Sequence, residues 1–179
     1  MHISRVWVLL IFICAVAVLM MLVLHLTKIG LLIHQRIPDR PHRRLFLASV
    51  SFFITFLGVR LLVASITHHI GPFGYVQVGG HHIHHLVWGI FLLLFTGYAD
   101  LTEVGIGDTS LSILMSRLLS IGYGIGAALT LDEFALWLNM DAMAYWSRQG
   151  RESIDAIVLF GALLAMGTWG APLLRRHGL

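Results

Sequence analysis

Charge is scarce in this chain. Only 12% of its 179 residues are charged, whereas 58% are hydrophobic and the mean hydropathy is +0.84. A soluble domain of this length could not cover so much apolar surface, so the composition excludes an ordinary soluble fold and predicts an integral membrane protein. The net charge of +3 lies in short connecting segments and forms no basic stripe, so no nucleic acid is expected as a partner.

Cysteine is almost absent as well. Cys14 is the only one, and it lies inside the first apolar run. A single cysteine permits no intrachain disulfide and no zinc site built on cysteines, and we expect this thiol to be a small buried hydrophobe. Low-complexity tracts and internal repeats are also lacking, so residues 1–179 are predicted to form one domain.

Long apolar runs are what the chain has instead. Each is close to the roughly 20 residues that a membrane-crossing helix needs. The first loosely resembles a signal peptide at its start, but its apolar character continues far enough to favour a retained helix. We predict an all-α, polytopic membrane helix bundle with about five transmembrane helices, over residues 6–33, 45–66, 81–98, 111–138 and 154–174.

Basic residues predict the orientation of this bundle. They gather in the connection between the first two spans and in the C-terminal tail, which an odd number of spans places on the same side. The positive-inside rule then puts the N-terminus outside and the C-terminus inside. The residues concerned are Arg36, Arg40, Arg43, Arg44, Arg175 and Arg176.

The most informative motif is a histidine cluster at the start of the third span. His81, His82, His84 and His85 are four imidazoles within five residues. Read as a helix, His81, His84 and His85 share one face, and imidazole is a common ligand for zinc, iron and copper. The spacing resembles one histidine box of membrane di-iron desaturases, which have about three such boxes and face the cytoplasm. A metal site is predicted here; the alternative is an interfacial belt that binds headgroups or titrates with pH.

Two further histidines follow the second span on the same side. His68 and His69 precede a Gly-Pro turn, and they could supply additional metal ligands or form an ordinary interfacial pair. One of them could also hold a haem together with a histidine of the third span. Four clustered histidines are more than a haem needs, which favours zinc or iron over haem as the cofactor.

Charged residues inside two of the spans lie at matching depths. Arg60 and Asp132 each fall about six residues before the end of an apolar run, roughly 9 Å below the same surface. A lone charge there costs about 2.5–3.5 kcal/mol, so we predict an Arg60–Asp132 ion pair. Glu133 is the predicted catalytic residue, as a metal ligand or as a general base for metal-bound water; the alternative is a structural carboxylate.

The connection before the last span is predicted to contact lipid. Tyr145 resembles part of an interfacial aromatic belt, and Arg148 and Arg151 are candidates for binding lipid phosphates. Membrane lipids are therefore the expected partners. In the fourth span, Gly122 and Gly126 have the spacing of a close helix–helix contact.

Three segments resemble a family of small bacterial integral membrane proteins that is known only as uncharacterised. The segments are His82 to Gly89, Leu131 to Leu138, and Tyr145 to Asp155, so the resemblance covers roughly the C-terminal two thirds. It implies a multi-pass protein of the bacterial inner membrane and supplies no activity.

The functional hypothesis combines the metal site with the membrane. We expect a zinc or di-iron metalloenzyme that acts on a lipid or another amphipathic substrate at the outer leaflet. The alternatives are a haem or metal-ion binding or transport protein, and a pH-responsive membrane scaffold without enzymatic activity. The sequence leaves open the substrate and whether the chain forms a homo-oligomer.

Overall fold

The computed structural model describes the backbone of residues 5–37, 39–70, 77–78, 81–82, 84–139 and 151–176. Side chains are described for residues 11, 14–33, 35–37, 39–70, 84–139 and 151–168. Within this part of the chain the fold is all-α, with seven helices and one two-stranded antiparallel hairpin. The helices are α1 (Arg5–Leu26), α2 (Lys28–Arg36), α3 (Arg40–Thr67), α4 (His85–Leu101), α5 (Ser110–Asp132), α6 (Phe134–Asn139) and α7 (Arg151–Arg176); the strands are β1 (Gln77–Val78) and β2 (His81–His82).

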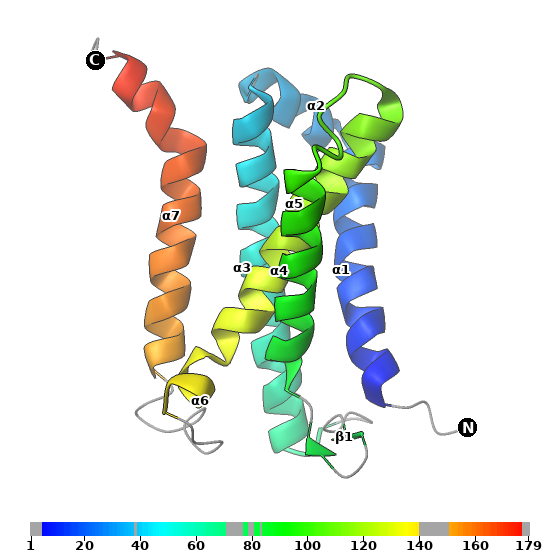
Figure 1. Ribbon diagram of the computed structural model, residues 1–179, viewed down its shortest axis with the longest axis vertical. Coiled ribbons are helices and arrows are strands. Elements are labelled where there is room, and N and C mark those ends of the chain that lie inside the picture. Colours follow the sequence, from blue (N-terminus) through cyan, green and yellow to red (C-terminus); the bar gives the residue numbers. More distant parts are fainter. Residues whose placement is uncertain are drawn as a thin grey trace.

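The long helices lie side by side and alternate in direction (Figure 1). α1, α4 and α7 run one way, whereas α3 and α5 run the other, and α5 crosses the bundle diagonally. The start of α4 and the end of α5 therefore lie at the same end of the bundle, which we call the carboxylate end because it carries Asp132 and Glu133. The opposite end, which carries Arg40 and Arg44, is called the arginine end.

The core is built around α5, which packs most extensively against α3 and α4. Ile121, Ile125 and Leu129 of α5 are fully buried, and Phe52 of α3 is buried beside the same helix. By contrast α1 packs loosely, and its Cys14 is exposed. The expectation of a buried thiol is therefore wrong, because Cys14 lies on the exposed side of α1, whereas Val16 and Met20 of the same helix pack into the core.

Small residues allow α4 and α5 to approach closely. A Cβ added to Gly89 would lie 2.8 Å from the Gly126 carbonyl oxygen and 2.5 Å from Thr130 Oγ1. Gly126 in turn faces Leu93 and Gly89, and Gly122 faces Thr96. This is the close helix–helix contact that the glycine spacing predicts, and it fixes how α4 lies along α5.

Three predicted spans differ from the observed helices. The first apolar run is two helices, because Thr27 ends α1 and its hydroxyl caps α2 by accepting a hydrogen bond from Ile29 N. The fourth run is interrupted at Glu133, which separates α5 from α6. The third helix begins at His85, since His81 and His82 lie in β2 and His84 is the N-cap. The prediction that His81, His84 and His85 share one helix face is therefore wrong.

Among the residues that the structure describes, two helices are long and apolar enough to cross a membrane, namely α3 and α5. α4 is apolar and shorter, at 17 residues. Length and composition thus mark α3 and α5 as membrane-spanning candidates among the described residues.

Arginines tie the loops together at the arginine end. Arg40 donates to the carbonyl oxygens of Gly105 and Ile106 in the α4–α5 connection, and its guanidinium lies 3.6 Å from Asp108. Arg44 forms an ion pair with Asp100 of α4. These contacts hold the start of α3 against the turn between α4 and α5.

Candidate functional site: a histidine–carboxylate network

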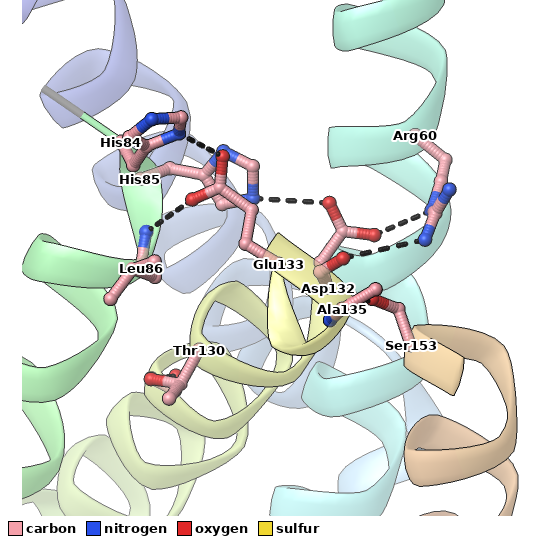
Figure 2. A network of polar contacts seen from close by, with 10 residues as sticks. Arg60, His84, His85, Leu86, Thr130, Asp132, Glu133, Ala135 and Ser153 are labelled. Carbon is pink, nitrogen blue, oxygen red and sulfur yellow. Dashed lines mark hydrogen bonds and ion pairs between the residues drawn. The ribbon is translucent and has the colours of Figure 1, made fainter. Parts of the chain in front are cut away.

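The carboxylate end holds a continuous chain of charged and polar side chains (Figure 2). It links Arg60 of α3, Asp132 and Glu133 at the end of α5, and His84 and His85 at the start of α4. The close crossing of α4 and α5 at Gly89 brings these two helix ends together. Residues distant in sequence thus form one site without contributing to a common helix face.

Asp132 is the centre of this network and is fully buried. Its Oδ1 lies 2.5 Å from Arg60 Nε, so the ion pair predicted from the depths of the two residues is present. Arg60 also approaches the Asp132 backbone carbonyl, at 3.4 Å, and its guanidinium lies over the Phe56 ring. The arginine is thus held by a carboxylate, a carbonyl and an aromatic face.

His85 lies between the two carboxylates. Its Nε2 is 3.0 Å from Asp132 Oδ2, and its Nδ1 is 3.4 Å from Glu133 Oε1. An ionised carboxylate can only accept hydrogen bonds, so both ring nitrogens face acceptors. With both ring nitrogens directed at carboxylate oxygens, His85 offers no free nitrogen lone pair to a metal ion in this arrangement.

The two carboxylate oxygens of Glu133 contact different groups at the start of α4. Oε1 lies 2.9 Å from His84 Nδ1, and Oε2 accepts a 2.9 Å hydrogen bond from the backbone N–H of Leu86. The first N–H groups of a helix have no partner within the helix, and a negative charge is favourable there. Glu133 therefore caps α4 from another helix, a role that no local sequence signal indicates because 47 residues separate the two groups.

The pKa of His84 is raised above its ordinary value. The main cause is its hydrogen bond to Glu133, and the negative charge of that carboxylate acts in the same direction, whereas partial burial opposes the rise. About a third of the His84 side chain is exposed, while the Glu133 side chain is almost entirely buried. The proton on His84 is therefore held at the boundary between a buried carboxylate and the surroundings.

Ligand groups for a metal do not converge within the described part of the chain. No set of three or more histidine, cysteine, aspartate or glutamate side chains there is arranged to hold a metal ion. His68 and His69 are exposed at the end of α3 and are not among the side chains of the network. The side chains of His81 and His82 lie outside the description, so the metal site, with its zinc or iron, stays a prediction from the sequence.

The α6–α7 region contributes contacts that the sequence did not indicate. Ser153 is fully buried, and its Oγ accepts a 2.9 Å hydrogen bond from the backbone N–H of Ala135. Asn139 donates to Glu152 Oε2 at 2.6 Å. Of the predicted headgroup ligands, Arg151 is exposed at the first position of α7, and Tyr145 and Arg148 lie outside the described residues.

Comparison with known proteins adds no assignment to this geometry. The chain matches no protein-family model, no curated protein and no solved structure. The function must therefore be argued from the network itself.

Proposed function

We propose that the chain is a multi-pass bacterial inner-membrane protein in which proton binding at the His84–Glu133 contact controls how firmly the start of α4 is held on α5. The observation that carries this proposal is the 2.9 Å approach of His84 Nδ1 to a carboxylate that also caps α4. A change in the charge of His84 therefore acts directly on the group that holds the first turn of α4 in place.

The proposed membrane arrangement has the N-terminus outside and the C-terminus inside. The alternating directions of α1, α3, α4, α5 and α7 suit five crossings (Figure 1). α3 and α5 have the length and hydropathy that a crossing needs. The arginine end would then face the cytoplasm, as the positive-inside rule favours, and the carboxylate end would face outward.

Burial of Glu133 favours a proton on His84. The Glu133 side chain is almost entirely buried, and His84 is in direct contact with it. Burying an uncompensated charge in apolar surroundings is costly. A proton on His84 places a positive charge against this carboxylate, so the packed form of the network favours the protonated state of His84.

Charged groups reach the surroundings of His84 from several helices. α3 presents Arg60, the end of α5 presents Asp132 and Glu133, and α4 itself presents His85. On α7, Glu152 is bound to Asn139 and Arg151 is exposed. Among these charged groups Glu133 is the one in contact with His84, and its carboxylate favours the positively charged form of the histidine.

The direction of the pH effect follows from linkage. A histidine whose pKa is raised on folding stabilises the folded state fully at pH values below its unfolded pKa, about 6.5. That contribution is lost as the pH rises through the higher pKa of the folded state. The fold should therefore weaken from mildly acidic to alkaline pH, beginning where α4 meets α5.

The decisive experiment is thermal unfolding of detergent-purified protein across pH 5.5 to 9, with chelator and with added zinc. We expect the melting temperature of the natural protein to fall as pH rises above about 6.5, and His84→Asn to flatten this fall. His68→Asn is the matched control, because His68 is exposed and lies outside the network. An identical pH dependence in His84→Asn and the natural protein would contradict the proposal.

The chelator arm separates this proposal from the metal hypothesis. If pH, and not metal, controls the network, chelator and zinc leave the melting curves unchanged. If chelator lowers the melting temperature and stoichiometric zinc or iron restores it, the metal hypothesis replaces the proton-binding one. The metalloenzyme prediction would then be tested with lipid substrates.

A further inference from the structure

A cavity lies at the arginine end, away from the histidine–carboxylate network. Its volume is about 310 Å³, it is lined by residues of α3, α4 and α5, and it is partly open to the surroundings. Ligand pockets in proteins typically start at about 300 Å³, so this space suits a small ligand or one part of a larger ligand. Nothing in the proposed proton-binding function uses it.

The lining of the cavity is mostly apolar. Ala48, Gly97 and Leu119 line it. Thr96, Ser120 and Tyr123 line it as well, but the first two hydroxyls are already committed to their own helix: Thr96 Oγ1 donates to Leu92 O, and Ser120 Oγ donates to Ser116 O. The interior therefore offers little to a polar ligand and much to a hydrocarbon chain.

Charge is confined to the end of the cavity near the helix termini. Arg44 lies in the second turn of α3, and Asp100 lies one residue before the end of α4. The two form an ion pair whose side chains are 33% and 57% exposed, so both are accessible to a ligand from outside. The cavity thus combines an apolar interior with a cation and an anion at its mouth.

We infer that this cavity binds one phosphatidylethanolamine molecule, with an acyl chain inside and the zwitterionic headgroup across Arg44 and Asp100. Arginine binds phosphate through a fork of donors, and a carboxylate accepts hydrogen bonds from a primary ammonium. The headgroup carries one group of each kind, so it can satisfy both side chains at once. A lipid with only negative charge would place that charge beside Asp100, and a choline headgroup has no N–H to donate.

Gly97 offers a direct way to close the cavity. A Cβ added there would meet no atom within 4 Å, so a larger side chain has space and needs no displacement of the backbone. Gly97→Leu should therefore fill the cavity and leave the fold intact. This separates loss of lipid from loss of structure.

The test is native mass spectrometry of detergent-purified protein with added phosphatidylethanolamine, phosphatidylcholine or phosphatidylglycerol. We expect one retained phosphatidylethanolamine, with a preference over phosphatidylcholine of about tenfold, as one hydrogen bond to a charged group provides. Gly97→Leu should lose this bound lipid at an unchanged melting temperature. Asp100→Asn should remove the preference between the ethanolamine and choline headgroups.

The matched control is Glu103→Gln, which removes a negative charge from an exposed position just beyond α4. It should bind lipid as the natural protein does. Equal retention of all three lipids by the natural protein would mean non-specific surrounding lipid only and would overturn the inference. Unchanged phosphatidylethanolamine binding in both Gly97→Leu and Asp100→Asn would overturn it as well.

Discussion

Each end of the bundle contains arginine–aspartate ion pairs, but the two ends differ in how far the aspartates are buried. At the carboxylate end Arg60 meets Asp132, which is fully buried. At the arginine end Arg44 meets Asp100 and Arg40 lies near Asp108, and both aspartates are exposed. A buried ion pair becomes very costly when one partner is removed, whereas an exposed pair contributes little. The comparison indicates that one end constrains the fold, while the charges of the other remain available to external partners.

The largest effect should come from breaking the buried pair. Asp132→Asn leaves Arg60 without its carboxylate and also removes the charge that faces His85. We expect a loss of about 3–5 kcal/mol in the free energy of unfolding, measured by denaturation in detergent. Exchanging the two residues, Arg60→Asp with Asp132→Arg, should fold better than either single change. A double variant no better than the singles would show that the pairing does not account for the cost.

The cap on α4 should give the next largest effect. Glu133→Gln keeps the shape of the side chain but removes the charge that contacts His84 and the Leu86 N–H. We expect a loss of about 1.5–3 kcal/mol near pH 6, as for hydrogen bonds to charged groups, and a smaller loss at alkaline pH, where His84 has released its proton. Unfolding measured at both pH values checks this; a loss independent of pH would contradict it.

The close contact between α4 and α5 can be tested separately from the charges. Gly89→Ala places a methyl group against Thr130 and the Gly126 carbonyl, which should cost about 1–3 kcal/mol and move the histidines away from the carboxylates. Gly97→Ala on the same helix is the matched control, because its new methyl group meets nothing. Equal stability of the two variants would show that the contact at Gly89 is not needed.

The smallest effect is expected at the arginine end. Asp100→Asn breaks an exposed ion pair with Arg44, so the free energy of unfolding should change by no more than about 1 kcal/mol. The measurement is the same denaturation experiment as for Asp132→Asn. A loss as large as that of Asp132→Asn would remove the distinction between the two ends.

The Arg60–Asp132 pair could be predicted from the sequence because a charge within an apolar run needs a partner, and few partners exist at the same depth. The start of α4 at His85 could not be predicted. The histidine spacing fits a helix, but the residue that caps α4 is Glu133, and a cap supplied from another helix leaves no local pattern. The same limit applies to Ser153, whose hydroxyl accepts from Ala135 across a connection.

The predicted start at residue 111 was within one residue of α5, where Thr109 caps the helix through Ser112 N. The predicted start at residue 45 fell five residues after the start of α3, which Asp39 and the proline after Arg40 mark, because hydropathy alone does not register these capping signals. The breaks at Thr27 and Glu133 were missed because apolar residues continue on both sides of each position. A run of apolar residues shows that a segment is buried in an apolar medium but not whether it is one helix or two.

The long-range cap on α4 also has a consequence for biosynthesis. During translation, Leu86 is synthesised 47 residues before Glu133, whose carboxylate accepts the hydrogen bond from the Leu86 N–H. Until α5 has emerged, the first turn of α4 lacks this partner, and the two histidines beside it lack theirs. In the proposed membrane arrangement, α4 should therefore insert together with α5 as a helical hairpin, and a chain truncated after Leu101 should leave α4 poorly inserted.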